Sequence, residues 1–453
     1  MKLLPNIKSP VKRELVWLTV PIFIETLLIM SLGAIDTFML SRVSDASVAA
    51  VGLANQIVSF CFIIFEVINL GTSVLCAQYL GASMRRQMET VVGVSLVVNL
   101  LFGLLISAFL FFWPYEIMSY VGLKGETLPI GAGYMKIVGA FAFVQALSMT
   151  LSACLRAVNK AYWPMAVVLV VNIMNIIGNY AFIFGKFGAP AMGAEGAAIS
   201  TVTARCVAMG ALFVIVFTTT ISRFPWEILV RWPKDEFRKL MKIGLPSAGE
   251  QMSYSFSQLV IAFFITGLGL EALAARTYCV NTILYTYIFC IAIAHGGAII
   301  IGHQVGAAKW KAAFVTGKYV LKTATFITLG LSLVLAVCGR WIMEALTDNP
   351  EIIHLGVTIF WIDLLLEIGR PINIFATNAL QSAGDVNYPF YVGVICMWTI
   401  AVGLAYLVGV EWGYGLIGIW WMFCLDENVR GAIFVHRWWS LKWQHKAFVS
   451  REV

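Results

Sequence analysis

Isolated carboxylates stand in the apolar stretches of this 453-residue sequence. Asp36 occurs in SLGAIDTFML, Glu250 follows a proline and a glycine in LPSAGE, and Glu25 takes the matching place in VPIFIE. A carboxylate at the centre of a bilayer costs about 2.5–3.5 kcal/mol, so each one needs a reason to be there. Such a group either makes a structural hydrogen bond, or faces a wet cavity where it exchanges a proton or, as at Glu250, binds Na⁺.

Amide side chains form a second polar feature. Asn172, Asn175 and Asn179 in NIMNIIGN fall at i, i+3 and i+7, so they line one face of a helix. They either hydrogen-bond to a neighbouring helix or line a cavity as neutral ligands for a cation or a substrate. Thr201 on the following segment and Glu25 are further candidates for the lining of that cavity.

The densest group of charges contains four acids and two arginines, which lie in two apolar segments near the end of the chain. They are Asp363, Glu367 and Arg370 in FWIDLLLEIGRPIN, and Asp426, Glu427 and Arg430 in CLDENVRG. Unpaired charges at membrane depth would be very costly, so we predict a network that joins the two helices, with each arginine against an acid. The network is either a permanent clamp or one that re-pairs when an acid is protonated.

The elements that carry these residues must be membrane helices. Hydrophobic residues make up 60% of the chain and charged residues only 12%, a balance that excludes a water-soluble globule. Twelve apolar runs are each long enough to cross about 30 Å of hydrocarbon. The predicted spans are 15–41, 47–80, 90–119, 128–157, 163–186, 192–221, 239–268, 272–306, 312–346, 351–383, 389–410 and 414–438.

The distribution of basic residues predicts the topology. With the amino terminus inside, 21 Lys and Arg fall in the inner connections and 5 in the outer ones. Inner loops of membrane proteins carry the excess of Lys and Arg, so we expect both termini in the cytoplasm. The net charge of +7 follows from this topology, and we expect no nucleic-acid partner.

The sequence also repeats itself at a spacing of 225 residues. Pro21 and Glu25 recur as Pro246 and Glu250, and the motif LRAVNKAYWP recurs as LQSAGDVNYP. The repeat predicts two six-helix bundles of the same orientation, a common plan among secondary transporters. The predicted domains are an amino-terminal lobe over 1–221, a cytoplasmic linker over 222–238 and a carboxy-terminal lobe over 239–453.

Taken together, these features resemble the multidrug and toxic compound extrusion (MATE) family over essentially the full length. The resemblance is carried by Asp36, the Pro-Gly-Glu opening of the seventh helix, the two echoed loops, the asparagine face and the GAEGAA turn. The segments EIGRPIN, AGDVNYP, GIWW and DENVR resemble a bacterial YoeA-like or YeeO-like branch, nearer the NorM type than the DinF type. The family's fold implies two V-shaped lobes around a central cavity.

The resemblance implies antiport, in which a drug or metabolite leaves while H⁺ or Na⁺ enters, by a monomer in the bacterial plasma membrane. Asp36 would match the family's first-helix carboxylate, and Glu250 its seventh-helix cation ligand. The NorM-type acid of helix ten falls near Arg370, and Glu367 could substitute for it one turn away. The DinF branch has an aspartate where this chain has Asn179. We therefore expect a cation site around Glu250, with Asp36 as a second titrating site.

Two kinds of observation argue against other functions: motifs that the sequence lacks, and membrane arginines that have acids nearby. The sequence contains no GxxxxGK[ST] loop, which argues against ATP-driven pumping, and no nucleophile, metal cluster or phosphate-binding set of an enzyme. No cofactor is expected beyond the coupling ion. A flippase for a lipid-linked or amphipathic metabolite is the alternative, but it would be expected to line its cavity with several arginines, whereas here the membrane arginines have acids nearby. We predict a cation-coupled exporter of amphipathic organic compounds, including drugs, dyes and flavin-like or peptide-like metabolites.

Overall fold

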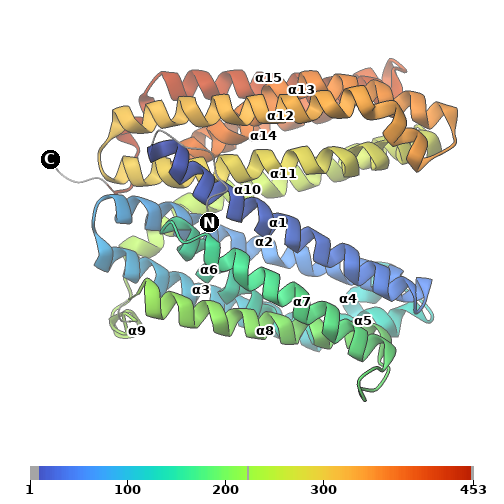
Figure 1. The fold of residues 1–453 in the computed structure, drawn as a ribbon, viewed down its shortest axis with the longest axis horizontal. Coiled ribbons are helices and arrows are strands. Elements are labelled where there is room, and N and C mark those ends of the chain that lie inside the picture. The colour runs from blue at the N-terminus through green and yellow to red at the C-terminus, as the bar shows by residue number, and fades with distance from the viewer. Residues whose placement is uncertain (1–9, 222–223, 450–453) are drawn as a thin grey trace. The chain divides into compact units, whose positions relative to one another are not determined.

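The computed structural model describes residues 10–221 and 224–449, and this part of the chain is helical with no strand (Figure 1). The predicted all-helical architecture is therefore confirmed. Both chain ends, which we expect in the cytoplasm, and the first residues of the predicted linker lie outside the described residues.

The helices of the first sequence repeat follow one another with short connections. They are α1 Pro10–Ser41, α2 Asp45–Gly81, α3 Arg85–Phe112, α4 Pro114–Tyr120, α5 Thr127–Ala140, α6 Ala142–Ala157, α7 Tyr162–Phe184 and α8 Gly193–Thr219.

After the four-residue α9, Glu227–Val230, the second repeat follows the same plan. Its helices are α10 Lys234–Thr266, α11 Leu270–Gly306, α12 Trp310–Leu346, α13 Pro350–Ser382, α14 Asn387–Cys396 and α15 Gly415–Trp439. Beyond α14 the same span continues in wider π-helical turns to Glu411, and a short 3₁₀ turn, Lys442–His445, follows α15.

Each of the twelve predicted spans coincides with a helix or with consecutive helical segments. Among the described residues, nine helices are long and apolar enough to cross a membrane, and the bent pair α5 and α6, with an angle of 49°, makes a tenth. The other two long helices are α10 and α15, which are more polar because they carry charged residues such as Glu250 and Arg430. Two of the helices that hold candidate site residues, α10 and α15, are thus the least typical membrane spans.

The sequence repeat is also a repeat of structure. Helices α2 and α11 begin and end at positions 225 apart. The echoed loops end their helices in the same way, because Asn159 and Gly384 both take a left-handed backbone, with φ of 62° and 98°. In each loop the next amide closes the turn, from Lys160 to the Leu155 carbonyl at 2.8 Å, and from Asp385 to the Leu380 carbonyl at 2.9 Å.

The chain forms two compact units whose boundaries fall inside α1 and α10. The first unit is Val20–Gly244, and the described part of the second unit is residues 10–19 together with 245–449. The opening turns of α10 thus pack with the first repeat, and the opening turns of α1 with the second. The lobe boundaries predicted from the sequence stay a prediction.

At equivalent positions of the two repeats, a glycine lets the opening turns of α10 and of α1 pack closely within their units. In the first unit, a Cβ on Gly71 of α2 would lie 2.8 Å from the Leu240 carbonyl oxygen of α10. In the second unit, a Cβ on Gly296 of α11 would lie 2.9 Å from Oγ1 of Thr19 in α1. Small residues let helix backbones approach closely where there is no water to drive association.

The tightest of these contacts yields a prediction. A Cβ on Gly244 would lie 1.9 Å from the Val67 carbonyl oxygen, so Gly244→Ala must push α10 away from α2. We expect a loss of about 1–3 kcal/mol in the free energy of unfolding, the usual cost of overpacking. The measurement is thermal unfolding of the detergent-purified protein.

The matched control is Gly210→Ala in α8, where the added Cβ would meet no atom within 4 Å. This substitution should be neutral or stabilising by up to about 1 kcal/mol, because alanine favours the helix. Equal melting temperatures for the two variants would contradict the close packing of α10 on α2.

Candidate functional site

Four predicted polar residues of the first unit form one hydrogen-bonded chain across α1, α7 and α8. Asn179 donates from Nδ2 to the Asp36 carboxylate at 2.6 Å and to the Asn175 side-chain oxygen at 2.9 Å. Asn175 in turn donates to the Thr201 hydroxyl at 3.2 Å. The side chains of Asn175 and Asn179 are fully buried, whereas Asp36 is half-buried. This series of hydrogen bonds therefore joins a buried amide pair to a carboxylate that solvent or a cation can reach.

The other two candidates of the first unit lie apart from this chain. Asn172 donates to the backbone carbonyl of Leu28 at 2.7 Å, a contact that fixes α7 against α1. Glu25 is buried and pairs with Arg156 of α6 at 2.7 Å. The structure thus brings Asp36, Asn175, Asn179 and Thr201 together and places Asn172 and Glu25 elsewhere on α1 and α7.

Sequence reasoning missed the partner of Glu25. Arg156 stands in the motif LRAVNKAYWP, where it was counted among the basic residues of an inner connection. It is in fact the penultimate residue of α6, and its side chain turns back to a carboxylate 131 positions earlier. The recurrence of the whole motif at 380–389 was the available signal, because it marked residue 156 as part of a repeated arrangement.

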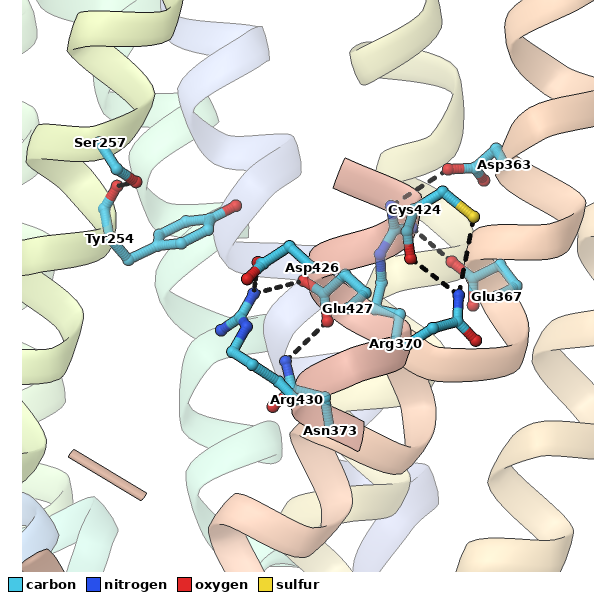
Figure 2. A network of polar contacts seen from close by, with 11 residues as sticks. Tyr254, Ser257, Asp363, Glu367, Arg370, Asn373, Cys424, Asp426, Glu427 and Arg430 are labelled. Carbon is cyan, nitrogen blue, oxygen red and sulfur yellow. Dashed lines mark hydrogen bonds and ion pairs between the residues drawn. The ribbon is translucent and has the colours of Figure 1, made fainter. Parts of the chain in front are cut away.

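The six predicted network residues lie together in the second unit, on α13 and α15 (Figure 2). Arg370 pairs with Asp363 at 3.1 Å and also with Glu367, both on its own helix. Both of these carboxylates are almost completely buried, with 1% and 0% of the residue exposed.

Helix α15 carries the matching half of the network. Arg430 pairs with Asp426 at 2.5 Å and with Glu427 at 3.0 Å, again within one helix. Each buried arginine thus lies against two acids that are three, four or seven positions away.

The network crosses between the helices through an amide that the sequence did not single out. Asn373 of α13 donates from Nδ2 to the Glu427 carboxylate of α15 at 2.6 Å. The helices can approach because Gly369 has no side chain, and a Cβ there would lie 2.6 Å from the backbone of Asn428. The predicted network therefore joins the two helices, with the arginine pairs inside each helix and the asparagine as the bridge.

The network holds more negative charge than positive charge. Four carboxylates share two guanidinium groups, so full ionisation leaves two negative charges in excess. Three buried oxygens, Oδ2 of Asp363, Oε2 of Glu367 and Oδ1 of Asp426, accept no hydrogen bond from the described residues. A buried charge of this kind is stable only when it is neutralised, so the network can take up protons or a cation.

Glu250 extends this acidic region from α10. Gln381 of α13 donates from Nε2 to the Glu250 carboxylate at 3.2 Å, and the backbone of Gly393 in α14 lies beside the other carboxylate oxygen. Arg430 acts electrostatically on Glu250 while it pairs with two acids of its own. Figure 2 shows the ring of Tyr254, one turn beyond Glu250, pointing towards the network. Glu250 itself is half-buried.

The acidic group does not have the arrangement of a transition-metal site. Within residues 10–221 and 224–449, no three His, Cys, Asp or Glu side chains converge as a metal-binding group. A Na⁺ ion at Glu250 would therefore draw on amide and carbonyl oxygens as well, which are ligands that hard cations prefer.

The acids are also specific to the second repeat. The positions 225 residues before Asp363 and Glu367 hold Val138 and Ala142. Both of these equivalents are buried apolar residues of the first unit. The two units therefore share one fold but differ in the charge that they enclose.

The sequence is similar to known membrane transporters over almost its full length. The model of the MatE family matches residues 21–181 and 246–407, one match in each repeat. An uncharacterised transporter, YisQ of Bacillus subtilis, is 38% identical over 95% of this chain and 94% of its own length. A probable multidrug resistance protein NorM of Thermotoga maritima is 24% identical over 99% of this chain and 97% of its own.

Solved structures agree in fold. The MATE transporter VcmN of Vibrio cholerae, crystallised in a bent form, superposes with a TM-score of 0.88 at 17% identity and covers 95% of this chain and 97% of its own. A transporter of the MOP superfamily from Pyrococcus furiosus superposes with a TM-score of 0.84 at 20% identity, covering 96% and 97%.

The charge network yields a prediction about stability. Arg370→Met leaves the buried carboxylates of Asp363 and Glu367 without their partner, so we expect the free energy of unfolding to fall by about 3–5 kcal/mol. The measurement is thermal or denaturant unfolding of the purified protein at neutral pH. The loss should shrink at low pH, where protonation of the two acids removes the unpaired charge.

The control is Arg340→Met in α12, which breaks the exposed ion pair with Glu344 at 2.8 Å. Exposed ion pairs contribute little, so this variant should melt like the unsubstituted protein. An Arg370 variant as stable as this control would refute the view that the arginine compensates the buried acids.

Proposed function

The chain belongs to the MATE family of membrane transporters, and we propose that it is a secondary antiporter that exports amphipathic organic compounds in exchange for H⁺ or Na⁺. The family consists of transporters and not enzymes, and this chain is a multi-pass membrane protein. The observation that carries the proposal is the excess of carboxylates in the second unit, with Asp363, Glu367 and Asp426 buried and Glu250 and Glu427 half-buried.

The coupling step that we propose is the neutralisation of this region by an external cation. Glu250 is the primary ligand, because it is half-buried and its hydrogen-bond partner, Gln381, is neutral. Glu367 is the second coupling acid, since one of its buried oxygens accepts no hydrogen bond from the part of the chain that the structure describes. Loading a cation removes charge next to Arg430, which then holds Asp426 and Glu427 differently, and this change is the signal to the rest of the lobe.

Exchange follows from competition for the same negative charge. A lipophilic cation and an inward-moving H⁺ or Na⁺ are both attracted to the acids, so binding of one weakens binding of the other. Alternating access of two V-shaped lobes around a central cavity then carries each in its own direction. Neutral flavin-like or peptide-like metabolites would need polar contacts from elsewhere in the cavity, because the three asparagines of α7 are buried and hydrogen-bonded within the first unit.

Asp36 is the second titrating site in this proposal. Its carboxylate accepts a short hydrogen bond from Asn179, which connects it to the buried amide of Asn175. A change in the charge of Asp36 therefore alters the contact between α1 and α7. Because residue 179 is an amide, Asp36 has no second acid at this position with which to share a proton.

We place the protein as a monomer in the bacterial plasma membrane with both termini in the cytoplasm, in a branch nearer the NorM type than the DinF type. The names of distant relatives, probable multidrug resistance proteins of about 24% identity, support the drug-export part of the proposal. The excess of basic residues in the predicted inner connections supports the orientation.

Flipping of a lipid-linked metabolite is the less favoured function. Such a function needs cationic side chains that are available to a pyrophosphate. Arg156, Arg370 and Arg430 are instead each held by a carboxylate. Their charge is therefore already compensated within the protein.

The central prediction concerns Glu250→Gln, a substitution that keeps the size and removes the charge. We expect at least about a tenfold loss of gradient-driven ethidium transport in proteoliposomes, with unchanged thermal stability. Na⁺ and pH gradients are imposed separately, so the experiment also identifies the coupling ion. The control is Glu351→Gln at the exposed start of α13, which should transport normally. Unimpaired transport by Glu250→Gln would remove the assignment.

Asp36→Asn tests the second site. We expect weaker ethidium export and a changed dependence of the rate on pH, because one titrating group is lost while the hydrogen bond to Asn179 can persist. The comparison is with Asp45→Asn at the exposed start of α2. A pH profile identical to that of the unsubstituted protein would exclude Asp36 from coupling.

A further inference from the structure

The two units contain the same carboxylate contact, made with different partners. In the first unit, Arg156 binds Glu25, and in the second unit Gln381 binds Glu250. Both pairs of positions are related by the repeat spacing of 225 residues. Arg156 is the penultimate residue of α6 and Gln381 the penultimate residue of α13, so the same helix end meets the same carboxylate.

The exchange of arginine for glutamine changes what the contact can do. Arginine is always charged and has five N–H donors but no acceptor, so it neutralises Glu25 permanently. Glutamine donates one N–H to Glu250 and leaves the charge uncompensated. Its own carbonyl oxygen stays available as a second ligand for a cation beside the carboxylate.

Neighbouring charges reinforce the difference. Arg156 acts electrostatically on Glu66 of α2 as well, so the fixed cation of the first unit serves two carboxylates. Around Glu250, the nearby cation is Arg430, which already pairs with Asp426 and Glu427. Burial separates the two carboxylates in the same direction, because Glu25 is buried with 5% of the residue exposed, whereas Glu250 is half-buried.

We propose that Gln381 is a positioning residue that holds Glu250 ready for an exchangeable cation, and that Arg156 is the built-in cation that keeps the equivalent Glu25 out of exchange. The inference rests on the proposed role of Glu250 as the coupling carboxylate. On this view, Glu250 exchanges a cation and Glu25 does not, because residue 381 is a glutamine and residue 156 is an arginine.

The first experiment makes the second unit resemble the first. Gln381→Arg supplies Glu250 with a permanent counter-charge, in a geometry that the Arg156 contact shows to be feasible. With the gradient that drives the unsubstituted chain, we expect at least about a tenfold loss of ethidium transport. Gln381→Met, which keeps the size without the hydrogen bond or the charge, should transport but need a higher cation concentration for half-maximal rate.

The outcomes separate this inference from the proposed function. If Glu250→Gln is inactive while Gln381→Arg transports normally, the inference fails and the coupling role of Glu250 stands. If Glu250→Gln is fully active, the proposed function fails first.

The second experiment removes the permanent counter-charge of the Glu25 carboxylate, and it needs no transport substrate. In the Glu250→Gln background, Arg156→Gln removes the counter-charge of Glu25, so the folded protein gains a cation site. The melting temperature of the purified protein should then rise by at least about 2 °C with added NaCl or at lower pH, because a bound cation stabilises the folded state. Choline chloride controls for ionic strength.

A third substitution, Glu25→Gln, should abolish this cation-dependent rise. A rise that persists in the triple variant would assign the new site to Glu66 and overturn the role given to Glu25. The absence of any rise in the double variant would show that Arg156 is not what keeps Glu25 out of cation exchange.

Discussion

A carboxylate that is held away from water must be matched by a positive charge, and the polar interior of this protein is arranged around that constraint. Glu25 meets it with Arg156, and the acids of α13 and α15 meet it in part with Arg370 and Arg430. Where the protein's own cations run short, as they do in the second unit, the missing charge has to come from outside. In the antiport that we propose, this shortage is the source of coupling, because the folded state then needs the ion.

The same constraint explains why two copies of one fold have diverged. The backbone plan is shared, down to the left-handed residues Asn159 and Gly384 that end α6 and α13. The buried side chains are not shared: Val138 and Ala142 occupy the places of Asp363 and Glu367. A duplicated scaffold can thus pair Glu25 with a permanent cation in one half, while the other half encloses an excess of carboxylates.

Much of this arrangement could be predicted from local patterns. The spacing of Asp363, Glu367 and Arg370 on one helical face indicates their pairing, because residues one or two turns apart meet on the same face. The pairing of Glu25 with Arg156 could not be predicted in this way, since the two residues are 131 positions apart and only the tertiary fold brings them together.

Neutral bridging side chains and helix bends were the other features that the sequence patterns did not predict. Asn373 carries no charge and so gave no sign that it bridges α13 and α15. The bend between α5 and α6 lies at Phe141, and the one nearby glycine, Gly139, does not by itself distinguish a bend from a continuous helix. These features depend on how neighbouring helices pack, which a pattern within one segment does not contain.

The crossing of α1 and α10 between the two units has a consequence for biosynthesis. The first unit is complete only when Leu240 and Gly244 pack against α2, and these residues are synthesised after the whole first repeat. The opening turns of α1, made at the very start, must wait for α11 before Thr19 reaches Gly296. Neither half can therefore mature alone, and the nascent chain must keep both sets of contacts open until its second repeat enters the membrane.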